Sequence, residues 1–483
     1  MDIKPVIIAA MAAAIPFALC AQSAEGTLQF ASDSLSLDDC LRIAMTNSPT
    51  IKVADMEVER MDYSKKEVIG QFLPNIDFSA NYSRTLAKQT MYMSMDGFGG
   101  LGGGSGSGDE DAPAENSRAG RAGSGNNGIK VGLDNSYSAG FQATLPLIAP
   151  QLWTTLQISD TQIERNAEAA RQSRQQLVSQ IKNAYYAFLL AEDSKRVIQE
   201  SYDMAALTHD TYVKQQALGA ASDYDVLRTS VAMKNIEPQL TQANIAIRRA
   251  KLNLLILMGI DANYDIKPVG SLSDYKDEMY SVALQANEGD YSGNADLRLL
   301  AIDTDLTAKN LKIQKLAYAP TLALTANYTW TSMNNGAPFK ELRWNPYSML
   351  GVSLSVPIFS GGQRYSRVRQ TKIQLEELRC QRENLERSIA SQVALAADNI
   401  RMNVEQVSSS AESVRQAETA YKIMDESFGI GAASYLNLRD SELQLTQARL
   451  SYVQSIYNYL IAASELELLK GTAPIEKYTS GNN

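Results

Sequence analysis

Residues that could support catalysis or bind metals are scarce in this sequence. The 483 residues include one histidine, His209, and three cysteines, Cys20, Cys40 and Cys380, which are widely separated. Zinc sites and redox motifs place their cysteines close together, so these lack metal-ligand spacing. The sequence also shows no nucleophile elbow and no phosphate-binding loop. We therefore expect no enzymatic activity, no cofactor and no metal centre, and we interpret His209, Cys40 and Cys380 as packing or surface residues.

Two other sets of side chains could bind ions. Met91, Met93 and Met95 occupy alternate positions, and thioethers in such a group could bind a soft metal ion. Apolar side chains at the end of a strand or in a loop give the same pattern, and we favour this second interpretation. The formal net charge of −9 argues against a nucleic-acid partner, because proteins that bind nucleic acids carry basic patches.

The N-terminus has the pattern of an export signal. Lys4 precedes an apolar run, 5–19, that is too short to span a bilayer. Small residues around 18–21 offer a cleavage site, which predicts a signal peptide over 1–21. Leu19 precedes Cys20 where a lipoprotein signal needs a small residue, which argues against acylation. No later stretch has about 18 consecutive apolar residues, so any membrane-spanning part must consist of strands.

A duplicated turn organises the rest of the chain. The run Gly219-Ala220-Ala221-Ser222 recurs as Gly431-Ala432-Ala433-Ser434, and in each copy a glycine follows the turn glycine by 40 positions, at Gly259 and Gly471. Repeats of this kind indicate one unit used twice. We assign the units to 35–260 and 295–471, with a connector over 261–294 and a tail over 472–483.

Each unit shows the same succession of periodicities. Alternating apolar and polar residues predict strands over 75–87 and 135–147, and again over 321–332 and 348–359. Helical patterns predict short helices over 50–72 and 296–317 and long helices over 151–218 and 362–428. They also predict return helices over 223–258, with a kink at Pro238, and over 434–470. A Gly-rich segment over 97–128 cannot bury a core, and we expect it to be disordered.

This pattern predicts an oligomeric channel. About eight strands form the smallest membrane barrel, so four strands per chain require several chains to close a ring. The two short helices of each unit together nearly match its long helix in length. Stacked end to end beside the long helix, they would form the wall of a hollow helical cylinder that continues the barrel.

The chain closely resembles the TolC family of outer-membrane efflux ducts over nearly its whole mature length. The resemblance is carried by Leu35-Ser36-Leu37-Asp38-Asp39 with Asn47-Ser48-Pro49, by Leu73-Pro74 and Ala319-Pro320 before strands, and by Leu145-Pro146-Leu147 and Val356–Gly362 after them. It implies a homotrimer in the outer membrane of a Gram-negative bacterium. Twelve strands would form the barrel, above a long periplasmic helical tunnel. It also implies partners: a periplasmic adaptor, an inner-membrane transporter of the RND or ABC class, and outer-membrane lipid.

The resemblance further implies a periplasmic gate at the turns. The family's acidic ring falls on Asp225, Asn437 and Asp440, with Tyr224 beside it, and the asparagine lowers the charge of the ring. Phe428 stands in place of a family tyrosine whose hydroxyl helps to latch the closed state. A ring of carboxylates would attract cations. The alternative is that these aspartates are ordinary solvated charges in first helical turns.

Two further surfaces are expected. Small residues let a partner backbone approach closely, so the turns (Gly219, Ala220, Ala221, Ser222, Gly431, Ala432, Ala433 and Ser434) would dock the adaptor. A tight helical hairpin that needs small residues for itself explains them equally well. Tyr82, Tyr328 and Trp330 suit an aromatic girdle at the membrane boundary, although strand propensity alone would also place aromatic residues there.

The sequence thus predicts a passive export duct of a tripartite efflux system. A duct for ABC-driven protein secretion has the same fold and remains an alternative. A structural coiled-coil protein of the envelope is the other alternative, and the matched parity of the four strands argues against it.

Overall fold

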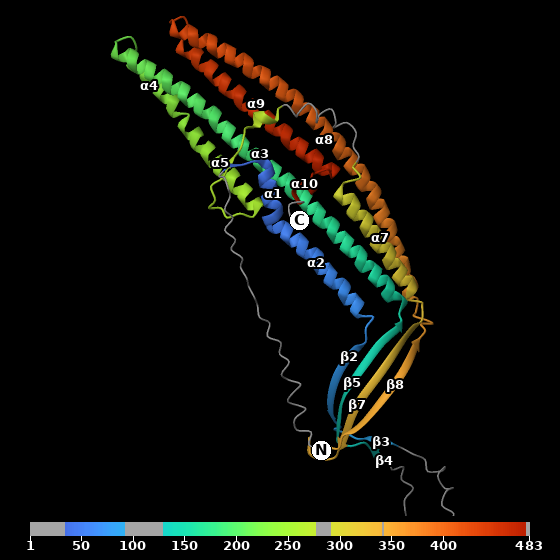
Figure 1. The fold of residues 1–483 in the computed structure, drawn as a ribbon. Helices are drawn as coiled ribbons and strands as arrows, with labels where there is room; N and C mark the ends of the chain where they lie inside the picture. Colours follow the sequence, from blue (N-terminus) through green and yellow to red (C-terminus); the bar gives the residue numbers. More distant parts are fainter. Residues whose placement is uncertain (1–33, 92–128, 277–290, 341, 480–483) are drawn as a thin grey trace, which may run out of the picture.

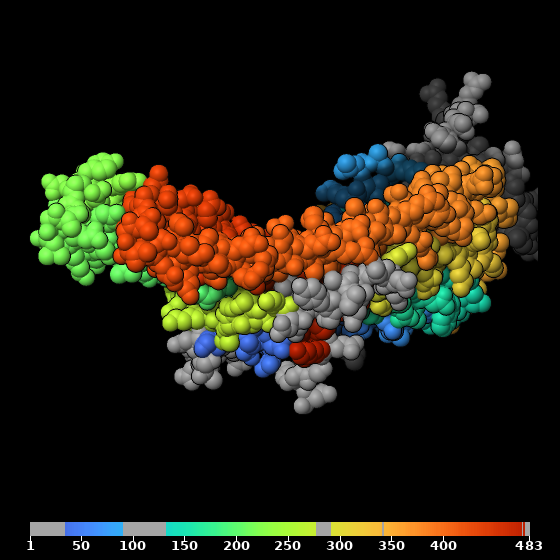
Figure 2. Space-filling view, turned by 90° about the horizontal axis from the view of Figure 1, so that it is seen from above, coloured from blue at the N-terminus to red at the C-terminus, as the bar shows by residue number. Residues whose placement is uncertain are grey.

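The computed structural model describes residues 34–91, 129–276, 291–340 and 342–479. The predicted signal peptide, the Gly-rich segment over 97–128 and residues Met93 and Met95 lie outside these ranges. The molecule is elongated, with a sheet at one end and two helical hairpins at the other (Figure 1). Figure 2 shows the same elongation from above, with the two hairpin tips next to each other at one end.

One four-stranded sheet contains all the predicted strand regions. Its order is β2-β5-β7-β8, and every neighbouring pair is antiparallel. The first predicted strand, 75–87, is shorter than expected and is followed by a separate strand, β3, which pairs with β4 in a small second sheet. The strand predicted over 348–359 was placed too late: it ends before Pro357, which has no N–H to donate to a neighbouring strand. The bounds are β2 Asn75–Arg84, β3 Gln89–Met91, β4 Ile129–Val131, β5 Asn135–Ile148, β7 Thr321–Asn334 and β8 Asn345–Ser355.

The register places the apolar positions of all four strands on one face. Phe78 lies opposite Phe141, and Phe141 lies opposite Tyr328. Tyr328 in turn lies opposite Ser348, so Leu350 in the same strand shares that face. Side chains alternate between the two faces along a strand, so the polar positions gather on the opposite face. The predicted parity of the strands is confirmed.

Two long helices run beside pairs of shorter ones. The first unit contains α1 Leu37–Asn47, α2 Pro49–Gly70, α3 Pro150–Ala217, α4 Asp223–Lys234 and α5 Glu237–Met258. The second contains α7 Ala295–Leu316, α8 Gln363–Gly429 and α9 Tyr435–Lys470. The return helix predicted over 223–258 is therefore two helices rather than one kinked helix. Pro238 lies in the first turn of α5, where a missing N–H has no cost.

The helices form a layer in the same order as the strands. α3 packs against α2 and α5 on one side and against α7 and α9 on the other, and α8 packs against α7 and α9. Along the chain, α2 precedes β2, β5 precedes α3, α7 precedes β7 and β8 precedes α8. The order of the strands in the sheet therefore matches the order of these helices in the layer. The single chain has two edges: β2 with α2 and α5 at one side, and β8 with α8 at the other.

The predicted stacking of short helices is confirmed at two joints between helix ends. Gly259 ends α5 with φ 71°, and a Cβ added there would lie 2.7 Å from the carbonyl oxygen of Asn47, where α1 ends. Gly471 ends α9 with φ 69°, and a Cβ there would overlap the carbonyl oxygen of Gly293, just before α7. Only glycine allows backbones to approach this closely in a left-handed conformation.

Side chains of α3 bind the second joint. The Arg171 guanidinium donates a 2.8 Å hydrogen bond to the carbonyl of Gly293, and the Gln175 amide donates one of 2.8 Å to the carbonyl of Gly471. Asn294 caps α7 and also donates to the carbonyl of Leu469 at 2.8 Å. The bonds to Leu469 and Gly471 satisfy carbonyls that the end of α9 leaves without an intrahelical partner, and the bond to Gly293 holds the segment before α7 in place.

A small cluster of elements surrounds the middle of α3. β1 (Ser34–Leu35) pairs in parallel with β6 (Lys267–Pro268), and η2 (Leu272–Tyr275) and α10 (Glu476–Thr479) lie nearby. The Tyr185 hydroxyl lies 2.9 Å from the carbonyl oxygen of Val269, and the Asp193 carboxylate accepts the Leu272 N–H at 2.9 Å. The described part of the predicted tail binds α1: Lys477 Nζ lies 2.8 Å from the Asp38 carboxylate.

Among the described residues, no helix is both long and apolar enough to cross a membrane.

Candidate functional site

The two predicted turns end the helical part of the molecule and have the same backbone geometry. Gly219 and Gly431 have φ values of 74° and 77°. Both residues are therefore in the left-handed conformation that favours glycine after a helix. The next residue in each turn, Ala220 or Ala432, donates its N–H at 2.8 Å to a carbonyl in the last turn of the preceding long helix. Both alanines are exposed. The duplicated motif therefore forms two matching, accessible tips (Figure 1).

Each tip leads into a helix capped by serine, but only the first cap is reciprocal. The Ser222 hydroxyl accepts the Asp225 N–H at 3.2 Å, and the Asp225 carboxylate accepts the Ser222 N–H at 3.2 Å. In the second tip, Ser434 accepts the Asn437 N–H at 3.3 Å. The hydrogen bonds from Ser222 hold the pKa of Asp225 below its ordinary value. Asp225 therefore carries a fixed negative charge, and it also stabilises the start of α4.

The other predicted gate residues lie on separate helices. Tyr224 is on α4 with 69% of its surface exposed, and Asp440 is exposed on α9. A single chain therefore holds the two aspartates on different hairpins, Asp225 on α4 and Asp440 on α9. A ring would require these residues to meet across the tips of several chains.

Phe428 packs against an aromatic cluster that joins the two hairpins. Its ring lies 6.0 Å from that of Tyr212 on α3, and Tyr212 in turn contacts Tyr435 on α9 edge-on at 5.7 Å. The guanidinium of Arg228 on α4 lies 4.8 Å from the centre of the Tyr435 ring. Burial, and then the charge of Asp225, raise the pKa of Tyr212. The first and second units thus contact each other at the tip through rings and a cation–π pair.

The sequence reasoning missed Tyr212, Arg228 and Tyr435. Tyr435 directly follows the serine that caps α9, so its position at the tip could have been predicted from the sequence. Tyr212 and Arg228 are seven residues before and nine residues after Gly219, which also placed them near the turn. The contacts of Tyr212 and Arg228 with Tyr435 could not have been predicted, because they depend on how the two hairpins pack.

The predicted girdle residues lie on the apolar face of the sheet. Tyr328 and Trp330 pack edge-on at 4.7 Å, and Trp330 also meets Phe141 at 6.2 Å. Tyr82 stacks on Tyr137 at 4.9 Å, close to the end of β2 that lies away from α2 in the chain. Phe141 lies opposite Tyr328 and so shares this face. The alternation of residues along its strand would have allowed us to include it among the predicted girdle residues. The aromatic side chains thus form a band across three strands.

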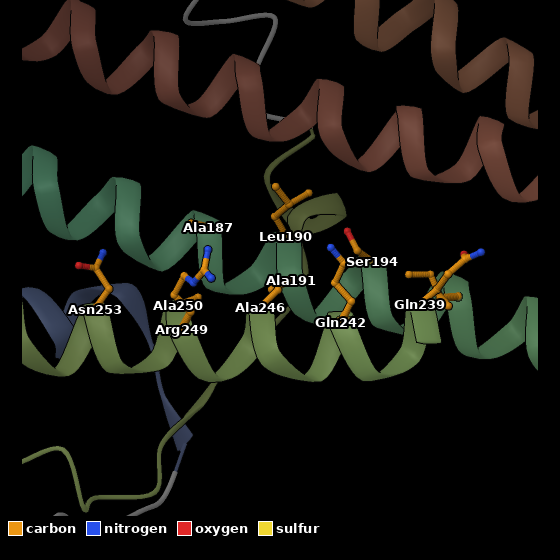
Figure 3. Close-up of a pocket in the computed structure, with 12 residues that line it drawn as sticks. Ala187, Leu190, Ala191, Ser194, Gln239, Gln242, Ala246, Arg249, Ala250 and Asn253 are labelled. Carbon is orange, nitrogen blue, oxygen red and sulfur yellow. The ribbon is translucent and has the colours of Figure 1, made fainter. Parts of the chain in front are cut away.

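A groove of 720 Å³ lies between α3 and α5, away from the tips (Figure 3). Small side chains form much of its lining, including Ala187, Ala191, Ala246 and Ala250. Arg249 is the only charged residue among those that line it. The groove therefore has no pair of groups for acid–base or nucleophilic chemistry. Nor do the described residues hold a metal-binding group of three or more His, Cys, Asp or Glu side chains.

A sheet with one apolar face, continued by a layer of long helices with accessible tips, defines a subunit of an outer-membrane duct. The model of the outer membrane efflux protein family matches residues 40–260 and 291–472, and the chain belongs to this family. The protein is an outer-membrane efflux channel with a periplasmic helical part.

Individual relatives are distant in sequence and close in fold. Outer membrane protein TolC of Escherichia coli (strain K12) is 21% identical, over 74% of this chain and 73% of TolC. Alkaline protease secretion protein AprF of Pseudomonas aeruginosa is 22% identical, over 70% of each chain. The Campylobacter jejuni CmeC outer membrane channel superposes with a TM-score of 0.66, at 17% identity, over 90% of this chain and 86% of CmeC.

Proposed function

We propose that three copies of the chain form a closed duct and conduct exported molecules passively from the periplasmic side to the exterior. The observation that carries the proposal is the pair of edges on the single chain. Within the described ranges, β2 and β8 each pair on one side only, and unpaired backbone groups in lipid cost several kcal/mol each. Pairing β8 of one chain with β2 of the next removes both edges, and three chains then give twelve strands.

The same closure brings the helical edges together. α8 of one chain would meet α2 and α5 of the next, because the helix layer has the order of the sheet. Apolar side chains are exposed on both edges, such as Leu395 and Met402 on α8 and Ile245 and Ile256 on α5. Burying them between chains would add hydrophobic stabilisation. The proposal assigns no catalytic step and no cofactor to the chain.

In this assembly the six tips would form the periplasmic end of the duct and its gate. The proposed ring contains Asp225, Asp440 and Asn437, with Tyr224 and Phe428 beside it. Phe428 has no hydroxyl to hydrogen-bond across the gate. We propose that packing of the Phe428 ring against Tyr212 replaces that hydrogen bond and holds the hairpins together.

We also propose that the tips bind a periplasmic adaptor, which joins the duct to an inner-membrane transporter. The docking surface would be the turns over 219–222 and 431–434, in which Ala220 and Ala432 are exposed. The apolar face of the sheet would contact outer-membrane lipid. Small-molecule efflux is the leading function, with a transporter of the RND or ABC class. Protein secretion driven by an ABC transporter is the second candidate, and the similarity to AprF is the observation that favours it.

Photo-crosslinking from the tips tests these partners. A photoreactive amino acid replaces Ala220 or Ala432 in cells, and mass spectrometry identifies the captured proteins. Capture of an adaptor is expected, and the transporter captured with it would separate small-molecule efflux from protein secretion. If protein shown to reach the outer membrane captured neither, docking at the tips would have to be abandoned.

Removing the two gate charges should weaken cation preference. We expect Asp225→Asn combined with Asp440→Asn to move the reversal potential in a salt gradient toward zero, because a ring of carboxylates selects cations. Asparagine has nearly the shape of aspartate but no charge, and Asn437 already occupies one position of the proposed ring. The measurement is single-channel recording in planar bilayers. Asp261→Asn, an exposed site in the connector, is the control, and a reversal potential unchanged in the double variant would contradict the gate.

A further inference from the structure

A buried carboxylate lies just behind the second tip, on the helix that carries Asp440. Glu442 on α9 is 2% exposed. One of its oxygens lies 3.0 Å from Nη1 of Arg439, and this guanidinium is itself mostly buried. The other oxygen, Oε1, has no hydrogen-bond partner among the described residues. A buried charge that is only half satisfied is costly to a folded structure.

The surroundings of Glu442 add to this cost. Asp425, on α8, places a second negative charge near the carboxylate, and Tyr421 on the same helix is also close. Burial, followed by the charges of Asp425 and Glu442, raises the pKa of Tyr421 to about 12. Burial is also the main cause that raises the pKa of Glu442, and Asp425 adds to it, whereas Arg439 opposes it.

A separate ion network lies deeper along the helices. Arg449 on α9 binds Glu418 on α8 at 2.8 Å and Glu200 on α3 at 2.6 Å. Towards the tip, Tyr435 on α9 is also close to Glu442, and Arg228 on α4 covers its ring. The two arginines of α9, Arg439 and Arg449, thus have acidic partners, and among the described residues no cation pairs with Oε1 of Glu442.

The carboxylate is present in only one of the two hairpins. The offset of 212 between the turn glycines (431 − 219) places Ser230 at the position that matches Glu442. A neutral side chain is therefore compatible with this position in the repeat, and hairpin formation does not require the acid. Glu442 lies eight residues after Ser434, roughly 12 Å along the helix axis. Any motion that separates α9 from α8 at the tip would expose it to water.

We propose that Glu442 is a proton-controlled lock on the second tip hairpin. A proton on this carboxyl favours the packed arrangement of α8 and α9, and its loss favours separation of the helices at the tip. This inference rests on the proposed gate, whose Asp440 is on the same stretch of α9. The lock would make opening of the duct depend on periplasmic pH, with acid favouring the closed tip.

The direction follows from linkage. The packed state binds the proton of Glu442 more tightly than a state in which the carboxyl is solvated. The extra stability of the packed tip is therefore complete below the ordinary pKa of a glutamate and is lost as the pH rises through the raised value. Each unit between the two pKa values changes the equilibrium by about tenfold per chain.

Hydrogen exchange of the purified protein in detergent tests the lock without using transport. After correction for intrinsic rates, amides over 435–446 should exchange more slowly at pH 5 than at pH 7.5. Glu442→Gln, which is permanently neutral, should exchange slowly at both pH values. Arg439→Gln removes the counter-charge and should move the transition to higher pH. Glu465→Gln, an exposed acid on the same helix, should behave as the wild type.

Two results would overturn the lock: wild-type exchange that does not differ between the pH values, or a pH effect that persists in Glu442→Gln. Single-channel recordings provide a second readout, in which acid should lower open probability in the wild type and less so in Glu442→Gln. A wild type that forms no channel at any pH would refute the proposed duct instead. The exchange result would still decide whether Glu442 controls packing of the hairpin.

Discussion

Replacing Gly471 with alanine is expected to destabilise the protein strongly and to prevent normal assembly. The left-handed backbone at this position costs a residue with a Cβ about 1–2 kcal/mol. The added carbon would also overlap the carbonyl oxygen of Gly293, so the ends of α9 and α7 would have to separate. Overpacking of this kind costs about 1–3 kcal/mol more. Thermal unfolding followed by circular dichroism would measure the loss.

Gly431→Ala is the matched control for this prediction. Gly431 has nearly the same positive φ, but a Cβ added there meets no atom within 4 Å. The control should therefore lose only the conformational part of the stability. Equal unfolding temperatures for the two variants would show that contact at the joint between α9 and α7 does not hold the helices together.

Replacing Ala432 with tryptophan is expected to abolish export while leaving the assembled protein intact. Ala432 is exposed at the second tip, so the indole has room within the single chain and should not disturb its fold. A partner that packs closely on the turn would meet a ring where it now meets a methyl group. The measurements are export of a toxic compound from cells and the amount of heat-modifiable oligomer in outer-membrane fractions.

Ala87→Trp provides the control, because Ala87 is exposed beyond β2 at the opposite end of the molecule. It should leave export normal. Normal export by Ala432→Trp would contradict docking at this turn and would favour the alternative that the hairpin needs small residues for itself. Loss of oligomer in that variant would instead locate the defect in assembly.

Much of the fold was predictable because its signals are local. The alternation of Phe78, Ala80 and Tyr82 determines a strand and its apolar face, and the repeated turn determines two hairpins. Gly259 and Gly471 marked helix ends from the sequence alone. These features depend on periodicity and on the conformational freedom of glycine, which act within a few residues.

Features that depend on packing between distant segments were not predictable. The contact of Phe428 with Tyr212 joins residues of different units, and the burial of Glu442 depends on how α8 covers α9. The binding of Lys477 to Asp38 spans almost the whole chain. The break before Pro238 differed from the predicted kink because proline fits the first turn of a new helix better than the interior of an old one.

The two open edges of the sheet also have a consequence before the duct exists. An unassembled chain carries β2 and β8 with one edge of each unpaired among the described residues, together with a broad apolar face. Strand edges of this kind pair readily with wrong chains, which is a route to aggregation. We therefore expect these edges to need shielding until the chains assemble. If the chain is produced faster than these edges can be covered, we expect insoluble protein even from the wild-type sequence.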